Sequence, residues 1–206
     1  MTDKANKIPW YKKLDFNSPV ILGFALVCLV ELLINYITGG KLSSFLAVVR
    51  YSWADILLYP RLFTHVIAHE SFSHFAGNFM MILVIGPLLE EKYGSKTMLR
   101  LILATALLTG LFNAIFFPGI GVLGASGIVF MLILLASFAN IHRGRFPVTA
   151  LLVGALYIGN EIVNGIWGND NISQISHIVG GLCGAGFGIF LHRKALTSDG
   201  SDSRLK

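Results

Sequence analysis

The chain has 206 residues, of which 54% are hydrophobic and only 13% are charged, with a formal net charge of +5. Soluble domains carry about 25% charged residues, so this composition excludes a soluble globular protein and predicts an all-α, polytopic membrane protein. The basic balance does not indicate nucleic-acid binding, because the lysines and arginines flank apolar segments, as charges that set membrane topology do. Cys28 and Cys183 lie in apolar segments and predict no disulfide framework.

Six apolar segments are long enough, or nearly so, to cross a bilayer core of about 30 Å. We expect these spans at 18–38, 72–91, 96–117, 126–142, 147–165 and 173–192. Thirteen of the 16 lysines and arginines then lie on the side of the two termini, and this side is predicted to be cytoplasmic. The expected organisation is a cytoplasmic N-terminal segment, a six-helix membrane domain and a cytoplasmic C-terminal tail, at residues 1–17, 18–192 and 193–206.

The long connection between the first two spans, residues 39–71, is too apolar for a solvated loop. It contains Trp53, Tyr59, Pro60 and Phe63. We therefore expect it to lie partly embedded along the membrane face of the bundle.

Two carboxylates, Glu31 and Glu161, fall inside expected spans. Ionisable groups inside a membrane commonly serve a function. Glu161 lies near the outer end of its span and can reach water there, whereas the sequence offers no partner for Glu31.

A serine flanked by glycines opens the fourth expected span, in the run Gly124-Ala125-Ser126-Gly127. Only 17 residues, about 25 Å of helix at 1.5 Å per residue, separate Ser126 from the next charge, Arg143. This length is shorter than a bilayer core, so the helix is expected to begin below the membrane surface, after non-helical backbone. Such backbone is tolerated in a membrane where it is buried in protein or lines a wet cavity. Ser126 is accordingly a helix cap or a nucleophile.

Three histidines lie close together in the sequence, His65, His69 and His74, and a metal site is one interpretation. His65 and His69 have the i, i+4 spacing that can place two ligands on one helix face. However, the run from His69 to His74 is one residue too long for the H-E-x-x-H zinc motif, and no cysteine or aspartate in the spans completes a ligand set. We expect no metal and no other cofactor.

Four polar residues on three expected spans lie at a similar depth. The number of residues to the next cytoplasmic lysine or arginine is 17 from Ser126, 16 from His177, 18 from His74 and 14 from Asn78, which puts all four within about one helical turn of the same level. Histidine can act as the base for a serine nucleophile. Donors for the oxyanion are available from the backbone N–H of Ser126 and the side chains of His74 and Asn78.

Together these motifs resemble the rhomboid family of intramembrane serine proteases, over about residues 55–192. The resemblance rests on the Gly124–Gly127 run, on His177 with the glycines that follow it, and on the H-x-x-x-x-H-x-x-x-N series His69, His74 and Asn78. It implies a six-helix rhomboid-like bundle of the basic bacterial form, located in the cell membrane.

The resemblance also implies roles for individual residues. Ser126 matches the family's nucleophile and His177 its base, while His74, Asn78 and the Ser126 amide match its oxyanion donors. Phe130 stands where the family usually has a tyrosine stacked under the base, a change that keeps the stacking and loses a phenol hydrogen bond. Further supporting positions are Gly124, His69, Arg61 and Glu90.

A glycine stripe continues the helical face of His177 through Gly181, Gly184 and Gly188. Small residues let a second helix approach closely. We expect Gly181 and Gly184 to contact the helix of Ser126 near Phe130 and Ile133.

The sequence therefore predicts a serine-type endopeptidase that uses a Ser126/His177 dyad to hydrolyse peptide bonds in or near transmembrane segments of other proteins. Its expected partners are these substrates and the lipid bilayer. The alternatives are a catalytically silent relative and a transporter. A transporter is expected to show inverted repeats and broken helices in both halves, and the sequence shows neither.

Overall fold

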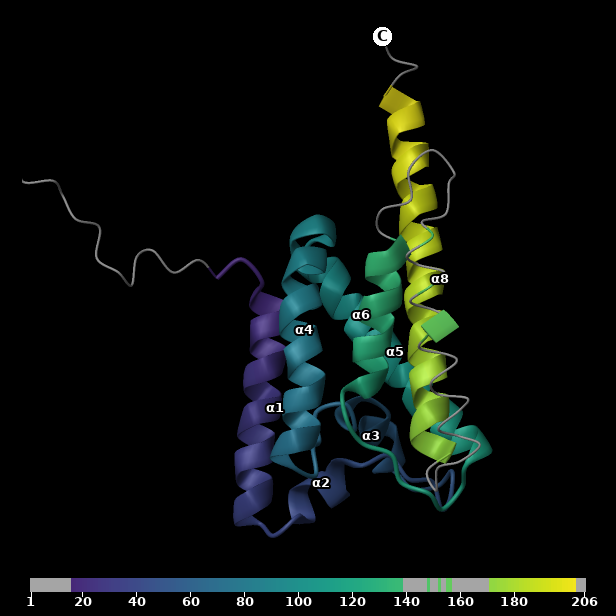
Figure 1. Cartoon of the computed structure of the whole chain (residues 1–206). Helices are drawn as coiled ribbons and strands as arrows, with labels where there is room; N and C mark the ends of the chain where they lie inside the picture. The colour runs from purple at the N-terminus through teal and green to yellow at the C-terminus, as the bar shows by residue number, and fades with distance from the viewer. Residues whose placement is uncertain (1–15, 139–147, 149–151, 153–154, 157–170, 203–206) are drawn as a thin grey trace, which may run out of the picture.

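The computed structural model describes residues 16–138 and 171–202, and between them positions 148, 152, 155 and 156. Throughout this part the chain is helical, apart from loops and one isolated β-bridge. The helices, in chain order, are α1 (Pro19–Ile37), α2 (Lys41–Leu46), α3 (Leu58–Thr64), α4 (Phe72–Tyr93), α5 (Ser95–Phe116), α6 (Ser126–Phe138) and α8 (Asn171–Asp202) (Figure 1). The predicted all-α architecture is confirmed for the described residues.

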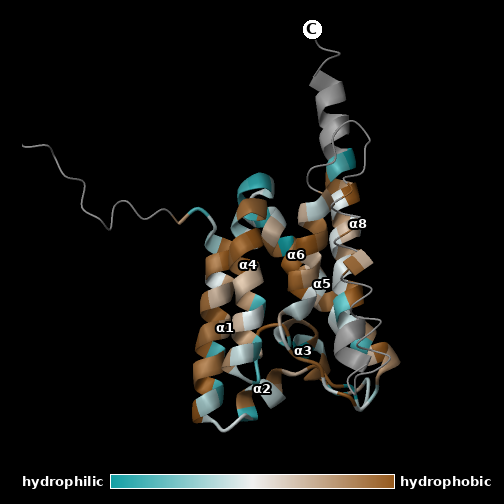
Figure 2. Ribbon diagram, in the orientation of Figure 1, coloured by the Kyte–Doolittle hydropathy of each residue, from teal (hydrophilic) through white to brown (hydrophobic). Residues whose placement is uncertain are grey.

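Three of the described helices, α1, α4 and α5, are long and apolar enough to cross a membrane. Their ends agree within two residues with the first three expected spans. Figure 2 shows that apolar residues dominate α1 over most of its length. The shorter α6 begins at Ser126, as expected, and α8 contains the expected sixth span. The expected fifth span, 147–165, lies almost wholly outside the described residues.

Three helices run in the same direction and begin at the same end of the bundle. Figure 1 shows that α4, α6 and α8 begin at the same end, which is also where α2 and α3 lie. By contrast, α1 begins at the opposite end, toward which α8 runs. The first turns of α4 and α6 are therefore neighbours in space although they are far apart in the sequence.

A carboxylate from α4 holds the first turn of α1. The helix begins with Pro19, whose missing N–H costs nothing at the first helical position. The next two N–H groups, of Val20 and Ile21, donate to Oε1 and Oε2 of Glu90 at 3.0 and 2.9 Å. Ser18, the residue before the helix, makes no capping hydrogen bond with its side chain. Because a helix N-terminus carries partial positive charge, the Glu90 carboxylate both satisfies these donors and attaches α1 to α4.

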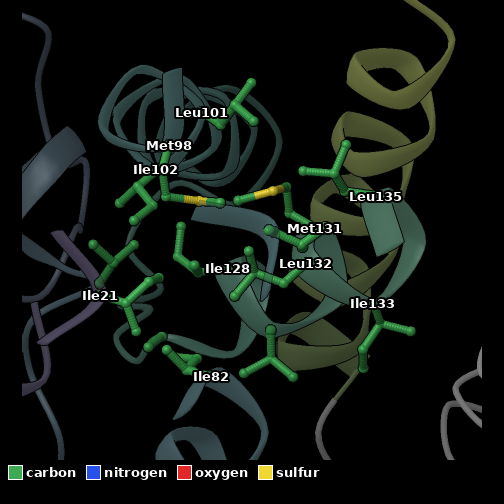
Figure 3. Packing of buried hydrophobic residues seen from close by; sticks show 14 of the residues in the cluster. Ile21, Ile82, Met98, Leu101, Ile102, Ile128, Met131, Leu132, Ile133 and Leu135 are labelled. Atoms are coloured by element: carbon green, nitrogen blue, oxygen red, sulfur yellow. The ribbon is translucent and has the colours of Figure 1, made fainter. Parts of the chain in front are cut away.

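The hydrophobic core lies where α1, α4, α5 and α6 meet, and α6 is its centre. Every residue of α6 from Gly127 to Leu135 is buried, as expected for a helix that is apolar all round. Figure 3 shows the side chains of Met98 from α5 and Met131 from α6 pointing toward one another. Ile21 and Ile82 bring α1 and α4 into the same cluster. The helix that carries Ser126 is thus enclosed by its neighbours.

The connection between α1 and α4 lies against the end of the bundle and exposes aromatic side chains. The apolar residues on its surface include Tyr51, Trp53, Ile56 and Tyr59. The guanidinium group of Arg61 links two parts of this connection, because its Nε donates to the carbonyl oxygen of Phe45 at 2.8 Å. Exposed aromatic rings of this kind suit a membrane interface, and the embedding of this segment stays a prediction.

Replacing Glu90 with alanine should weaken the attachment of α1, because the N–H groups of Val20 and Ile21 lose their shared acceptor. Removing a helix N-terminal cap costs about 0.5–2 kcal/mol, and we expect a loss of this size in the free energy of unfolding, measured by titration with a denaturing detergent. Glu91→Ala is the matched control, since Glu91 is adjacent and exposed. Equal stability of the two variants would contradict the capping role.

Candidate active site

The backbone before Ser126 is non-helical, as predicted, and neighbouring elements satisfy its polar groups. Val122 exchanges two hydrogen bonds with Val48, both at 3.0 Å, and the N–H of Gly124 donates to the carbonyl oxygen of His65 at 2.9 Å. The amide of Asn113, on α5, donates to the carbonyl oxygen of Ile120 at 3.0 Å. These four hydrogen bonds hold the start of α6 against three other parts of the chain.

The ring of His74 lies directly against Gly124, two residues before Ser126. A Cβ atom at Gly124 would come within 2.7 Å of both Cε1 and Nε2 of His74. Gly124 also has a φ of +113°, which side chains rarely adopt. Both the ring contact and the positive φ therefore require glycine at this position. The contact also places the first turn of α4 beside the first turn of α6.

The imidazole ring of His177 stacks on Phe130. The two ring centroids lie 4.5 Å apart and the ring planes differ by 8°. Phe130 is four residues after Ser126, one turn along the same face of α6. The predicted stacked ring is thus present with phenylalanine in place of the family's usual tyrosine.

Backbone contact between α6 and α8 depends on glycines at every fourth position of α8. A Cβ atom would overlap the carbonyl oxygen of Gly127 if placed at Gly180, that of Met131 if placed at Gly184, and the side chain of Phe138 if placed at Gly188. The predicted contact of Gly184 with α6 is confirmed.

The centre of the contact differs from the predicted stripe. Gly181 lies at the edge of the contact, where a Cβ atom would be an ordinary 3.8 Å from Leu134, and Gly180 takes the central position. The reason is geometric, because helices in close contact interlock along rows of residues four apart, and such a row through Gly184 contains Gly180. The atoms of α6 nearest to Gly181 and Gly184 belong to Leu134 and Met131, the residues that follow Ile133 and Phe130.

His69 and Asn78 form one hydrogen-bonded pair. Nδ1 of His69 lies 3.0 Å from the carbonyl oxygen of Ile67, and its Nε2 lies 3.3 Å from Nδ2 of Asn78. Burial lowers the pKa of His69 to about 4, so the ring is neutral at neutral pH. A carbonyl oxygen only accepts, so Nδ1 carries the proton and Nε2 accepts from the Asn78 amide. The tautomer of His69 thereby determines which end of the amide faces it.

A cavity of about 390 Å³ opens between the α1–α4 connection and the first turns of α4 and α6. Its lining includes Ser126 and His74, and Ser176, the residue before His177. The described lining does not include Asn78, which is buried beside His69. The cavity thus joins Ser126 to the surface of the protein at this end of the bundle.

The nitrogens of His65 and His69 are engaged within the fold. Nδ1 of His65 lies 3.1 Å from the carbonyl oxygen of Arg61, and its Nε2 lies 3.2 Å from the hydroxyl of Thr109. Among the described residues, no group of three or more potential ligands is placed to hold a metal. In the structure, His65 reaches Thr109 on α5 and His69 reaches Asn78 on α4.

A family model described as a rhomboid domain matches residues 58–194, well over half of the chain. This chain belongs to the rhomboid family. A curated relative, "RHOMBOID-like protein 12, mitochondrial" of Arabidopsis thaliana, is 28% identical over an alignment of 142 residues that covers 58% of this chain and 42% of that relative. The predicted family is therefore confirmed, and this chain matches less than half the length of the relative.

The family and the apolar helices make this rhomboid a multi-pass membrane protein. The expected location in a bacterial cell membrane gains no support from the comparison, since the relative is named as mitochondrial and comes from a plant. The assignment of Ser126, His177, His74 and Asn78 to catalysis remains a prediction.

Gly184→Val should force α6 and α8 apart by about an ångström, because the added side chain overlaps the backbone of Met131. A displacement of this size can reduce the rate at a reactive centre about a hundredfold. We expect a correctly inserted protein whose Ser126 reacts about a hundredfold more slowly with a fluorophosphonate. Gly186→Val is the matched control, since a Cβ atom there meets open space. Labelling of the Gly184 variant at the control rate would show that the close contact does not position the site.

Proposed function

We propose that this rhomboid is an intramembrane serine endopeptidase in which Ser126 is the nucleophile and His177 the base. The observation that carries the proposal is the stacking of His177 on Phe130, one turn after Ser126 on α6. The stack puts the imidazole over the helix face that begins with Ser126. A serine hydroxyl becomes a strong nucleophile when a neighbouring base accepts its proton.

The proposed reaction begins when Nε2 or Nδ1 of His177 accepts the Ser126 proton and Oγ attacks the carbonyl carbon of the scissile bond. The oxyanion that develops is stabilised by the backbone N–H of Ser126 and by the side chains of His74 and Asn78, near the positive end of α6. His177 then gives its proton to the leaving amine, and the C–N bond breaks to leave an acyl ester on Ser126. A water molecule hydrolyses this ester in the second half of the reaction, with His177 again as base.

The proposed topology is six spans with both termini in the cytoplasm, so that the site faces the outer side of the membrane. The cavity beside Ser126 and His74 supports hydrolysis there, because it gives water a route to the acyl ester. An α-helical substrate hides its peptide bonds from a nucleophile. We therefore propose transmembrane substrates with small residues and weak helices near their outer ends.

Ser126→Ala and His177→Ala should each abolish proteolysis of single-span substrates by the purified protein, and the double variant should be scarcely worse. Groups that act as one unit have effects that do not add. The measurement is the rate of product formation in reconstituted membranes.

More than a few per cent of activity in either single variant would contradict the dyad. A catalytically silent rhomboid, which binds membrane helices without cleaving them, is distinguished by covalent labelling. Ser126 of a protease reacts with a fluorophosphonate, and Ser126 of a silent relative does not.

Asn78→Ala should reduce kcat by about 10²–10³, or 2.7–4 kcal/mol, the usual cost of losing one oxyanion donor. Activity should remain measurable because His74 and the Ser126 amide are still present. Met80→Ala serves as the control, since Met80 is exposed on the same helix. If kcat is unchanged in a folded Asn78 variant, Asn78 does not take part in the reaction.

A further inference from the structure

A buried polar cluster joins α1, α2 and the segment before α4. It consists of Glu31, Asn35, Ser43 and the backbone of His69, and all four residues are buried. The carbonyl oxygen of His69 accepts from Ser43 Oγ at 3.0 Å and from Asn35 Nδ2 at 3.3 Å. The N–H of His69 donates to Oε2 of Glu31 at 3.1 Å. Both polar backbone groups of His69 are thus held by side chains from α1 and α2.

The charge of Glu31 follows from counting the protons available for the hydrogen bonds among Glu31, Ser43 and His69. Oε1 of Glu31 and Oγ of Ser43 lie 2.7 Å apart, and Ser43 has a single hydroxyl proton. An ionised Glu31 would need that proton, leaving the Ser43 oxygen against the His69 carbonyl oxygen with no hydrogen between them. A protonated Glu31 satisfies every group, because Oε1–H donates to Ser43 Oγ and the Ser43 hydroxyl donates to His69.

The surroundings of the carboxyl group agree with this arrangement. The described hydrogen-bond partners of Glu31 are a hydroxyl and a backbone N–H, and neither is charged. Glu31 is 4% exposed and lies within a span. A carboxylate buried in a membrane without a positive partner is costly, whereas a hydrogen-bonded carboxylic acid is not.

The cluster reaches the candidate site through the side chain of His69. The ring of His69 accepts a hydrogen bond from the amide of Asn78 and contacts the ring of His74 edge to face, with centroids 5.1 Å apart. His69 lies outside any helix. The position of its ring therefore depends on the hydrogen bonds that fix its backbone. Glu31 and Ser43 provide that placement.

We infer that Glu31 is a positioning residue, held as a neutral carboxylic acid, that orients the Asn78 amide toward the oxyanion through His69. This inference rests on the proposed function. With Nε2 of His69 in place, the Nδ2 end of Asn78 turns toward the ring and the second N–H of the same nitrogen remains for the oxyanion. If His69 shifts, the amide can flip and present its oxygen, which repels an oxyanion.

The test compares Glu31→Gln with Glu31→Leu. A glutamine reproduces the neutral acid, since its NH₂ group donates to Ser43 and its oxygen accepts from the His69 N–H. We expect near wild-type kcat for the Gln variant, a ten- to hundredfold lower kcat for the Leu variant on the scale of a displaced catalytic group, and little change in KM for either. Equal losses of kcat in both variants would overturn the inference.

A double-variant cycle with Asn78→Ala separates positioning from general stability. If Glu31 acts through Asn78, the Leu substitution should have almost no further effect on kcat once the amide is gone. If the two substitutions instead lower kcat independently, so that their fold-losses multiply, the inference is overturned. The proposed function would still stand in that case, as long as proteolysis requires Ser126. Proteolysis that survives Ser126→Ala would contradict the proposed function itself.

The protonation state can be measured without any substrate. Infrared difference spectra of the wild-type protein and Glu31→Gln at neutral pH should contain the C=O stretching band of one protonated carboxylic acid. Carboxylate bands in its place would overturn the neutral assignment. This readout depends on neither folding of the Leu variant nor proteolytic activity.

Discussion

The candidate site depends on the backbone contact between α6 and α8. Ser126 and Phe130 belong to α6 and His177 to α8, so their relation is set by how closely these helices approach. In a membrane the hydrophobic effect does not drive helices together, and close packing provides the attraction. Gly180 and Gly184 lie against the backbone of α6 with no room for a side chain. That contact puts the imidazole of His177 onto Phe130.

Non-helical backbone imposes the second constraint. The segments before α4 and α6 are non-helical, and each must find hydrogen-bond partners inside the protein. Asn113 and the β-bridge of Val48 and Val122 serve the segment before α6, while Glu31 and Ser43 serve the segment before α4. Buried polar side chains such as Glu31, Ser43 and Asn113 therefore hold these loops in place, and the loops position the first turns that carry His74 and Ser126.

Local properties were predictable from the sequence alone. The lengths and ends of the first three spans follow from runs of apolar residues, and the start of α6 follows from a glycine-flanked serine too close to Arg143 for a full span. A similar depth for Ser126, His74 and His177 was predicted by counting residues to the next lysine or arginine, because the rise of an α-helix is constant, and the structure does bring His74 and His177 to the first turns of α6. The same counting predicted non-helical backbone before Ser126. Each of these inferences needs only a periodic or local pattern.

Contacts between distant segments were decided by the tertiary structure. The sequence predicted a glycine face on α8, but whether Gly180 or Gly181 lies at its centre depends on the rotation of α8 against α6, which the partner helix determines. Glu31 had no apparent partner because Ser43 and His69 stand 12 and 38 residues away. A hydrogen bond depends on positions in space to within a few tenths of an ångström, and a sequence specifies these only after its helices have packed.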